Sequence, residues 1–339
     1  MSGYLEGAFG MSVVGIVGAG KRYLDYYKPV IESMGLEISG FVTKSGKLSD
    51  EVGSYPVYQS MQELYKETDP DFFISVVPYH ETPNILVQAC DLECDILVET
   101  PVGRYSQSES IMQKIHQSEI LAGVVEQWPF LPMECFKRLV IDSGVIGRVR
   151  LVENDHRTYN YHGIAQLRNY IGKDAEVSKT VGSMRENYPL NKKEDYWNII
   201  LAHFNNDTTL LFKYSDLMSK CDDMRGARTL RVYGETGTII SGCRIEDDTR
   251  MDLFTCLDSN GDVQSIDIDV VEGEGTIKEI VSNFPNGEIV SWKNPFSEFA
   301  FSEDQIAIAL HIQGMIDGKV LWSVEDGFKD LQLGDPSWS

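Results

Sequence analysis

The chain has 339 residues, enough for about two domains with sizeable cores at roughly 150 residues per domain. Its 42% hydrophobic and 24% charged residues are typical of a globular protein. The 52 acidic and 30 basic residues give a formal net charge of −22 at pH 7, which opposes binding to nucleic acids and to anionic membranes. We therefore expect small molecules and other proteins as partners.

Neither a membrane segment nor a metal site is expected. No run of 18 apolar residues occurs, and the first ten residues lack the basic start and apolar stretch of a signal peptide, so we expect a cytoplasmic protein. The six cysteines are scattered, and only Cys90 and Cys94 lie close together. Because no second cysteine pair and no His-x-x-x-His spacing accompanies them, reduced thiols are the better interpretation.

Short apolar runs recur along the first 125 residues, and stretches of helical length follow most of them. The runs cover residues 13–17, 38–42, 72–77, 96–98 and 121–125, and the helical stretches include 81–90 and 106–117. Strand and helix alternating at this spacing indicate βαβ units. The N-terminal domain, residues 11–128, is therefore expected to be α/β with a doubly wound parallel sheet.

The rhythm changes after Trp128, and strand-like runs dominate the rest of the chain. A helix over 132–143 is expected to end at Gly144, and a second helix should end at Ile171 before Gly172. Ser302 and Gln305 have the spacing of a capping box, which predicts a helix that begins at Ser302. The strand-like runs cover 149–152, 197–204, 209–214, 228–233 and 266–271. Residues 129–339 are thus expected to form an α+β domain.

The first strand leads into the segment GIVGAGKRYLDYY, which has the context of a dinucleotide-binding loop. Gly18 would allow the tight turn, and Gly20 would let the backbone approach a pyrophosphate. Tyr23 stands where a third glycine is usual, so either the loop or the helix packing must differ there. The alternative is a plain strand-to-helix turn.

The second strand ends in Thr43-Lys44-Ser45 instead of the acid that usually binds the ribose of NAD. A hydroxyl, a cation and a hydroxyl suit a 2′-phosphate, and Lys21 and Arg22 add positive charge nearby. NADP is therefore favoured over NAD. An exposed turn lysine would explain Lys44 equally simply.

Polar residues follow the later strands of the predicted parallel sheet. The segment ILVETPVG places Glu99, Thr100 and Pro101 directly after a buried strand, at the edge of the sheet where ligands bind in open α/β folds. The alternative is an ordinary turn. The segment after residue 76 also follows a strand, so Val77, Pro78 and His80 are candidates to face the cofactor. The alternative for His80 is an ordinary surface or core histidine.

Four segments together resemble the glucose–fructose oxidoreductase / inositol dehydrogenase / rhizopine catabolism (Gfo/Idh/MocA) family. They are SVVPYHETPNI, ILVETPVG, GVVEQWPFLPMECFKRLVIDSGVIGRV and YHGIAQLRNYIG. The resemblance implies an N-terminal Rossmann domain and a C-terminal domain with a large mixed, mostly antiparallel sheet, whose open face commonly makes a dimer. A homodimer or homotetramer is expected. It also implies oxidation or reduction of a sugar, cyclitol or related polyol with NADP or NAD.

The chain departs from that family at two catalytic positions. The family's strand-end motif is Glu-Lys-Pro, in which the lysine helps to move the hydroxyl proton, and Thr100 stands at the lysine position. A second motif places an Asp four residues before a His on a helix. His162 matches the His, and Thr158 stands at the Asp position.

His162 is the remaining group best suited to proton transfer, because the imidazole side chain titrates near neutral pH. Tyr161 and Arg168 lie seven residues apart on the adjacent helical face. The candidate residues are therefore His162, Thr100 and Tyr161 for catalysis; Thr158, Arg168 and Trp128 for substrate binding; and Gly18, Gly20, Lys21, Arg22, Tyr23, Thr43, Lys44, Val77, Pro78, His80, Glu99, Pro101 and Gln127 for cofactor binding.

The sequence thus predicts an NAD(P)-dependent oxidoreductase that acts on a sugar-like CH–OH group. Two alternatives stay open. One is a glycosidase or lyase in which bound NAD oxidises a ring hydroxyl transiently and is reduced back. The other is a non-catalytic sensor that binds nucleotide and sugar on the same fold.

Overall fold

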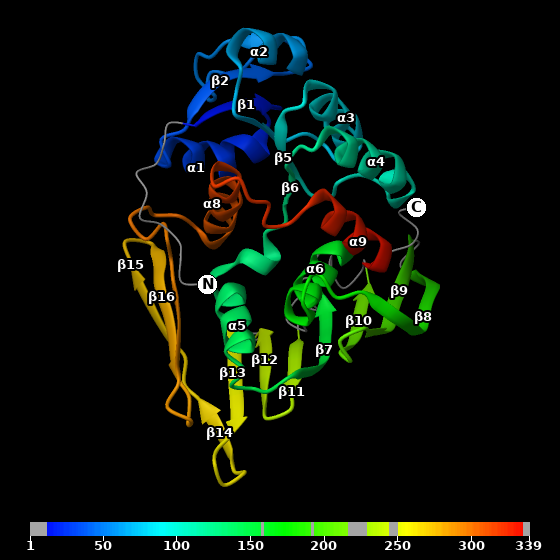
Figure 1. The fold of residues 1–339 in the computed structure, drawn as a ribbon, viewed down its shortest axis with the longest axis vertical. Helices are drawn as coiled ribbons and strands as arrows, with labels where there is room; N and C mark the ends of the chain where they lie inside the picture. The colour runs from blue at the N-terminus through cyan, green and yellow to red at the C-terminus, as the bar shows by residue number, and fades with distance from the viewer. Residues whose placement is uncertain (1–11, 157–158, 191–192, 216–228, 244–249, 335–339) are drawn as a thin grey trace.

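The computed structural model describes residues 12–156, 159–190, 193–215, 229–243 and 250–334. The N-terminal domain is built on a six-stranded parallel sheet with the order β3-β2-β1-β4-β5-β6 (Figure 1). Its strands are β1 (Val13–Val17), β2 (Glu37–Val42), β3 (Val57–Tyr58), β4 (Phe72–Ser75), β5 (Asp95–Glu99) and β6 (Ala122–Val125). All five strand pairs are parallel, and the order is that of a Rossmann fold, as predicted.

Helices connect these strands and explain why the strands read as continuous apolar runs. Every residue of β4 and β6 is buried, as expected of a parallel sheet covered on both faces. The helical segments are a π-helical turn (η1, Tyr23–Tyr27), α1 (Lys28–Ser33), α2 (Met61–Thr68), α3 (Thr82–Leu92), a 3₁₀ turn (η2, Tyr105–Gln107), α4 (Ser108–Ser118) and a second 3₁₀ turn (η3, Trp128–Phe130).

The second domain contains an eight-stranded mixed sheet with the order β14-β13-β12-β11-β7-β10-β9-β8. Only β7 and β10 pair in parallel; the other pairs are antiparallel. The strands are β7 (Val149–His156), β8 (Val177–Leu190), β9 (Lys193–Phe204), β10 (Thr209–Ser215), β11 (Leu230–Gly234), β12 (Gly237–Cys243), β13 (Arg250–Leu257) and β14 (Val263–Ile266).

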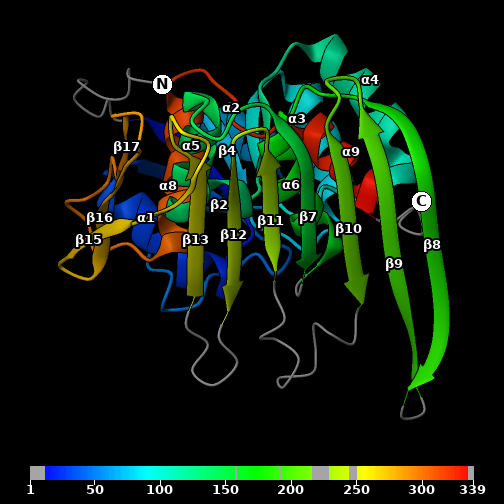
Figure 2. The same ribbon diagram turned by 90° about the horizontal axis from the view of Figure 1, so that it is seen from below.

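The helices α5 (Pro132–Ser143) and α6 (Asn160–Ile171) lie on one face of this sheet, and the strands stand in front of them in Figure 2. Gly144 and Gly172 end these helices at the predicted positions. The ring of Phe136 stacks on Phe254 of β13 at 5.8 Å, so α5 is held to the sheet by aromatic packing.

The predicted strand over 266–271 is wrong in one respect, because the chain changes sheets inside it. Strand β14 ends at Ile266, and β15 (Asp269–Gly273) begins a separate three-stranded sheet with β16 (Thr276–Asn283) and β17 (Ile289–Lys293). The alternation of apolar and acidic residues continues across the break. Period-two patterning therefore predicted extended chain correctly but carried no information about the sheet to which it belongs.

The last two helices return to the first domain. Helix α8 (Glu303–Ile316) packs against β6, η1 and α1, and α9 (Val324–Gly334) packs against α4, α6 and β6 (Figure 1). Ser302 caps α8 through the predicted capping box with Gln305. The amide of Val124 donates to the carbonyl oxygen of Trp322 at 2.8 Å, so the C-terminal segment covers the edge strand β6.

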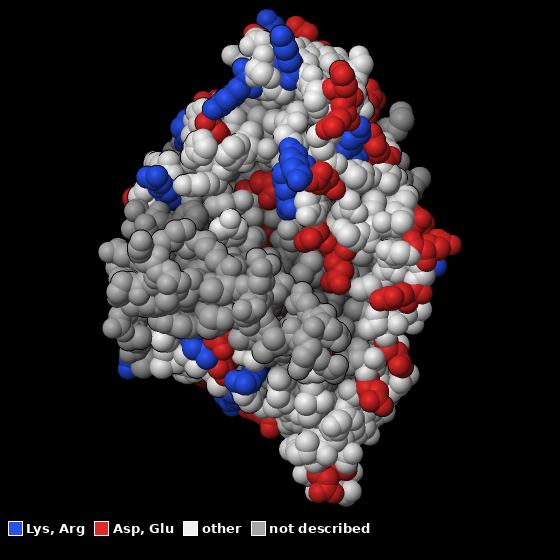
Figure 3. All heavy atoms as spheres, turned by 180° about the vertical axis from the view of Figure 1, so that it is seen from behind, with Lys and Arg blue, Asp and Glu red and all other residues white. Residues whose placement is uncertain are grey.

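Acidic and basic side chains are interspersed on the described part of the face seen in Figure 3. Among the described residues, no helix is both long and apolar enough to cross a membrane.

Candidate active site

The loop after β1 has the geometry that a dinucleotide requires. Gly18 has a φ of +92°, and a Cβ atom there would lie 2.7 Å from the carbonyl oxygen of Val76. The amide of Gly18 donates to the carbonyl oxygen of Val42 at 2.9 Å, which holds the loop against β2. A Cβ atom on Gly20 would meet no atom within 4 Å. The loop is thus tightly folded at Gly18 and open to the approach of a ligand at Gly20, which fits a pyrophosphate.

The prediction that Tyr23 binds the cofactor is wrong for its side chain. Tyr23 is fully buried and packs edge-on against Phe41 of β2, with ring centroids 5.2 Å apart. Burial raises the pKa of its hydroxyl. The tyrosine that replaces the third glycine begins a π-helical turn, Tyr23–Tyr27. The helix therefore accommodates the bulky residue by a local change of winding, and the side chain becomes part of the core.

Arg22 and Glu99 join the first helix to the end of β5. The Nε atom of Arg22 donates to Glu99 Oε1 at 2.7 Å, and the hydroxyl of the buried Tyr27 donates to the same oxygen at 2.7 Å. Glu99 Oε2 accepts the amide of Thr100 at 3.1 Å. Arg22 was predicted to add charge near the end of β2, but it is held at β5 instead. The peptide bond between Thr100 and Pro101 is cis.

The end of β2 is connected to the start of α3 by an ion pair. Lys44 Nζ lies 2.5 Å from Glu81 Oε1, and His80 Nε2 lies 3.3 Å from the same oxygen. The hydroxyls of Thr43 and Ser45 donate to the carbonyl oxygen of Lys47. The three predicted 2′-phosphate ligands are thus engaged within the protein in this structure. Lysine 44 is exposed, as are Lys21 and His80.

The end of β6 meets helix α6 at the predicted acid/base residue. His162 Nδ1 lies 2.8 and 2.9 Å from the two carboxylate oxygens of Glu126. The side chain of Glu126 is only 2% exposed, and that of His162 is 12% exposed. One oxygen of Glu126 also accepts the amide of Trp128 at 3.2 Å. The pair forms because α6 packs against η3, the turn that follows β6.

Sequence reasoning missed Glu126 although a signal was present. Glu126 follows the buried strand β6 immediately, as Glu99 ends the buried strand β5. The same argument that directed attention to Glu99 applies to both positions. The two carboxylates nevertheless differ, since Glu99 faces the first helix and Glu126 faces His162.

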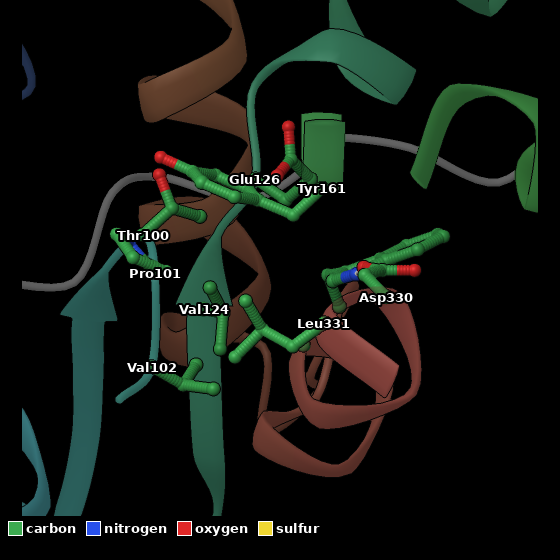
Figure 4. A pocket seen from close by; sticks show the side chains of 10 residues that line it. Thr100, Pro101, Val102, Val124, Glu126, Tyr161, Asp330 and Leu331 are labelled. Atoms are coloured by element: carbon green, nitrogen blue, oxygen red, sulfur yellow. Dashed lines mark hydrogen bonds between the residues drawn. The ribbon is translucent and has the colours of Figure 1, made fainter. Parts of the chain in front are cut away.

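Thr100 and aromatic side chains surround this pair. Tyr161 forms a side-chain hydrogen bond with Thr100, and burial raises the pKa of its phenol. In Figure 4 the hydroxyls of Thr100 and Tyr161 point toward one another. The ring of Tyr161 lies 4.4 Å from that of His162, and the ring of Trp128 lies 6.1 Å from it. Residues from β5, β6, α6 and η3 thus converge on one point.

Gln127 lies beside the pair and fits a role toward a ligand. It is buried, and its amide nitrogen has no hydrogen-bond partner within the described part of the chain. Buried polar groups usually have a partner, so an orphan donor next to a candidate site indicates a place where a ligand group would bind.

Arg168 is wrong as a predicted substrate contact. Its guanidinium group pairs with Asp326 at 2.9 Å and with Asp330 at 2.6 Å, and it lies over the ring of Trp322. The side chain is 3% exposed. The residue therefore joins α6 to α9, and periodicity could not reveal this because both partners lie about 160 residues farther along the chain. Thr158, another predicted contact, lies outside the described residues.

His311 supports the backbone at the same place. This buried histidine of α8 has its Nε2 atom 3.0 Å from the carbonyl oxygen of Glu126, and its ring packs edge-on against Phe130 at 4.5 Å. Burial lowers its pKa to about 4. A neutral imidazole therefore donates to the strand end that carries Glu126.

Residues 13–124 match the model of the family GFO_IDH_MocA, described as an oxidoreductase family with an NAD-binding Rossmann fold. Over these residues the N-terminal domain is similar to the Gfo/Idh/MocA oxidoreductase family. The predicted resemblance is thereby confirmed for this domain, and the matched family is one described as NAD-binding. No curated protein sequence matches the chain.

Solved structures with the same fold cover nearly the whole chain at low sequence identity. An oxidoreductase from Agrobacterium radiobacter in complex with NAD⁺, L-tartaric acid and magnesium is 16% identical, with a TM-score of 0.67 and 96% of this chain and 95% of that chain covered. The UDP-N-acetylglucosamine 3-dehydrogenase GnnA from Acidithiobacillus ferrooxidans is 12% identical, with a TM-score of 0.64 and coverage of 95% and 96%. At these identities the similarity establishes the fold of both domains.

An oxidoreductase from Desulfitobacterium hafniense that is described as NADPH-dependent is 14% identical. Its TM-score is 0.66, with 96% of this chain and 93% of that chain covered.

Proposed function

We propose that the protein is an NAD(P)-dependent oxidoreductase that acts on a CH–OH or carbonyl carbon of a sugar, cyclitol or related polyol. One observation carries the proposal: a continuous series of contacts joins the nucleotide loop to an acid/base group. Arg22 beside the loop contacts Glu99, Thr100 next to Glu99 contacts Tyr161, and His162 next to Tyr161 contacts Glu126. A cofactor on the loop and a substrate beside His162 would therefore be neighbours.

When bound, the nicotinamide cofactor supplies the acceptor or donor of a hydride at its C4 atom. The chain supplies binding, orientation and proton transfer. Gly18 and Gly20 fit the pyrophosphate. The hydroxyls of Thr100 and Tyr161 can hydrogen-bond the reacting oxygen of a substrate, and His162 takes the hydroxyl proton in oxidation or returns it in reduction.

The aromatic side chains support a sugar-like substrate. Trp128 and Tyr161 flank His162, and Tyr159 stacks on Tyr161 at 5.6 Å while its own side chain is 59% exposed. Flat aromatic faces suit the apolar C–H faces of a sugar or cyclitol ring, while the hydroxyls of the ring require polar partners such as Gln127.

We also propose a preference for NADP over NAD, because Lys44 is the first cation after β2 and no acidic residue directly follows that strand in the sequence. A 2′-phosphate would compete with Glu81 for the ammonium group of Lys44.

The oxidoreductase proposal is tested by a screen of sugars, cyclitols and sugar acids with both cofactors, followed by the absorbance of the reduced nicotinamide. With an active substrate, His162→Ala should lower kcat by about 10²- to 10⁴-fold with little change in cofactor affinity. His116→Ala is the control, since His116 is exposed on α4. An enzyme indifferent to His162→Ala would contradict the assignment of His162.

A second candidate function is that of a non-catalytic sensor. The observation that favours it is the uncharged Thr100, which follows β5 at the position of the motif lysine. Such a protein would bind cofactor and sugar and turn over neither. A protein that binds NADP(H) tightly but oxidises no polyol in the screen would favour the sensor over the enzyme.

A further inference from the structure

We infer that Glu126 is the positioning residue of the reaction: its buried carboxylate accepts the Nδ1 proton of His162 and thereby presents Nε2 to the substrate hydroxyl. The inference rests on the proposed function for its catalytic consequence, but the geometry of the pair stands independently of it. Nothing in the sequence motifs assigns this role to a residue at the end of β6.

The distances restrict how His162 can be protonated. Both carboxylate oxygens lie within hydrogen-bond reach of Nδ1, at 2.8 and 2.9 Å. An ionised carboxylate only accepts hydrogen bonds, so Nδ1 must carry the proton when the pair is formed. In the neutral ring the lone pair is then on Nε2, which is the atom that can take a proton.

Glu126 is itself fixed by groups from two other segments. Its Oε1 atom accepts a hydrogen bond from the amide of Trp128 at 3.2 Å, and its backbone carbonyl oxygen accepts one from Nε2 of His311 at 3.0 Å. With 2% of its side chain exposed, the carboxylate has little water to compete for its hydrogen bonds. A buried carboxylate whose side chain and backbone are each held by a hydrogen bond can orient an imidazole more strictly than an exposed carboxylate can.

The orientation of His162 matters because this residue is the proposed proton acceptor. Thr100 is uncharged and cannot stabilise a developing alkoxide as a cation would. In the oxidation direction, Nε2 of His162 would take the O–H proton of the substrate as the carbonyl group forms, and a bound nicotinamide cofactor would supply the acceptor for the hydride released from the carbon. The imidazolium so formed is stabilised by the Glu126 carboxylate and then releases its proton to water.

The test is the tautomer of His162, which can be measured without substrate. In the full-length protein labelled with ¹⁵N-histidine, the His162 signals are assigned by their loss in His162→Gln. Above neutral pH we expect the parent protein to show a protonated Nδ1 and an unprotonated Nε2. Glu126→Gln should change this to a mixture, because a carboxamide can accept or donate a hydrogen bond at Nδ1. Glu109→Gln, the same change at an exposed position on α4, should leave it unchanged.

Activity provides the second readout. With a substrate identified, Glu126→Gln should lower kcat by about 10²- to 10⁴-fold, with KM and cofactor affinity within a few-fold of the parent protein. Glu126→Asp, which keeps a carboxylate, should recover part of the loss and serves if the glutamine variant does not fold. If the tautomer and kcat are both unchanged in Glu126→Gln, Glu126 is a structural partner only and the inference fails. If the tautomer changes but no polyol is oxidised, Glu126 positions His162 as inferred and the proposed substrate class falls.

Discussion

Thr100 replaces the lysine of the family motif, so the proton-transfer role of that lysine must be taken by another residue. At the position where the family motif has a lysine, this chain has a hydroxyl that forms a hydrogen bond with Tyr161. The neighbouring Glu99 keeps its contacts with Arg22 and Tyr27, so the end of β5 keeps its anchoring without the lysine. Proton transfer then depends on α6 and on the carboxylate at the end of β6.

Variants at Thr100 should separate positioning from proton transfer. Thr100→Ala removes one hydroxyl and one hydrogen bond to Tyr161, so we expect kcat to fall by less than about tenfold, far less than in His162→Ala. Thr100→Ser, which keeps the hydroxyl, is the control. Steady-state kinetics with the substrate from the screen decides the point, and a loss in Thr100→Ala as large as that in His162→Ala would show that Thr100 is required for proton transfer.

His311 makes the stability of the protein depend on pH. Its pKa is about 4 in the folded protein because burial disfavours the charged ring, against an ordinary value of 6.5. Between these values the unfolded chain binds a proton that the folded chain does not, so this contribution to stability is complete above pH 6.5 and is lost as the pH falls toward 4. The expected loss of unfolding free energy between pH 7 and pH 5 is about 2 kcal/mol.

The variant His311→Gln isolates that effect, because glutamine can still donate to the carbonyl oxygen of Glu126 but does not titrate. Urea denaturation at pH 7 and pH 5 should show a smaller decrease in the variant than in the parent protein. Equal decreases in both proteins would mean that His311 titrates normally in the folded state.

At the scale of elements, local signals in the sequence were reliable and long-range ones were absent. The capping box at Ser302 and the glycines after α5 and α6 mark helix ends because each signal acts within one helical turn. No local signal predicted that α8 and α9 pack against the first domain. The amphipathic pattern of a helix identifies its buried face but not the sheet that the face covers.

In the candidate site, too, residues marked by a local motif could be predicted and residues brought together by tertiary packing could not. The Gly18 loop, Thr100 and His162 could be found from motif and strand-end position. Glu126 as the partner of His162 and the engagement of Arg168 by Asp330 depend on side chains 36 and 162 residues apart in sequence. Only packing in three dimensions brings such residues together.

The connection between β2 and α3 should set cofactor preference. The Lys44 and Glu81 side chains form an ion pair at 2.5 Å, and this pair lowers the pKa of the Glu81 carboxyl. We expect Lys44→Ala to weaken binding of NADP(H) several-fold more than that of NAD(H), and Glu81→Gln to strengthen binding of NADP(H), since it frees Lys44 and removes a negative charge near the 2′-phosphate.

Fluorescence titration with NADPH and NADH provides the measurement, and 2′,5′-ADP compared with 5′-ADP tests the same site without the nicotinamide. Because Lys21 is exposed in the neighbouring loop, Lys21→Ala is the control that shows how much any nearby positive charge contributes to cofactor affinity. Parent protein that binds both cofactors equally would contradict the NADP preference.

At the scale of the whole molecule, the eight-stranded sheet has helices on one face, and apolar side chains lie on the other. Along β13, Met251, Leu253 and Leu257 are exposed, whereas Phe254 and Cys256 are buried on the helical side. A row of directly paired residues crosses the open face of the sheet: Leu201, Leu211, Glu153, Arg231, Ile240 and Leu253.

Charged side chains in this row and beside it form ion pairs. Arg231 NH1 lies 3.3 Å from Glu153, and Lys213 Nζ lies 3.0 Å from Asp155 on the neighbouring strand. A flat face with apolar side chains and internally neutralised charges is well suited to contact a second copy of itself, because a twofold interface uses the same surface on both subunits.

We therefore predict a homo-oligomer in which this face is covered by another subunit. Light scattering should give a mass of at least twice the chain mass of 38.2 kDa at micromolar concentration.

Leu253→Glu places a charge in the centre of the apolar strand β13 and should shift the protein toward the monomer, because a buried unpaired charge strongly destabilises an interface. Ile289→Glu, at an exposed position on the small sheet, is the control and should leave the mass unchanged. A parent protein that scatters as a single 38.2 kDa species would contradict the prediction, and an oligomer that persists in Leu253→Glu but dissociates in Ile289→Glu would move the interface from the open face of the large sheet to β15, β16 and β17.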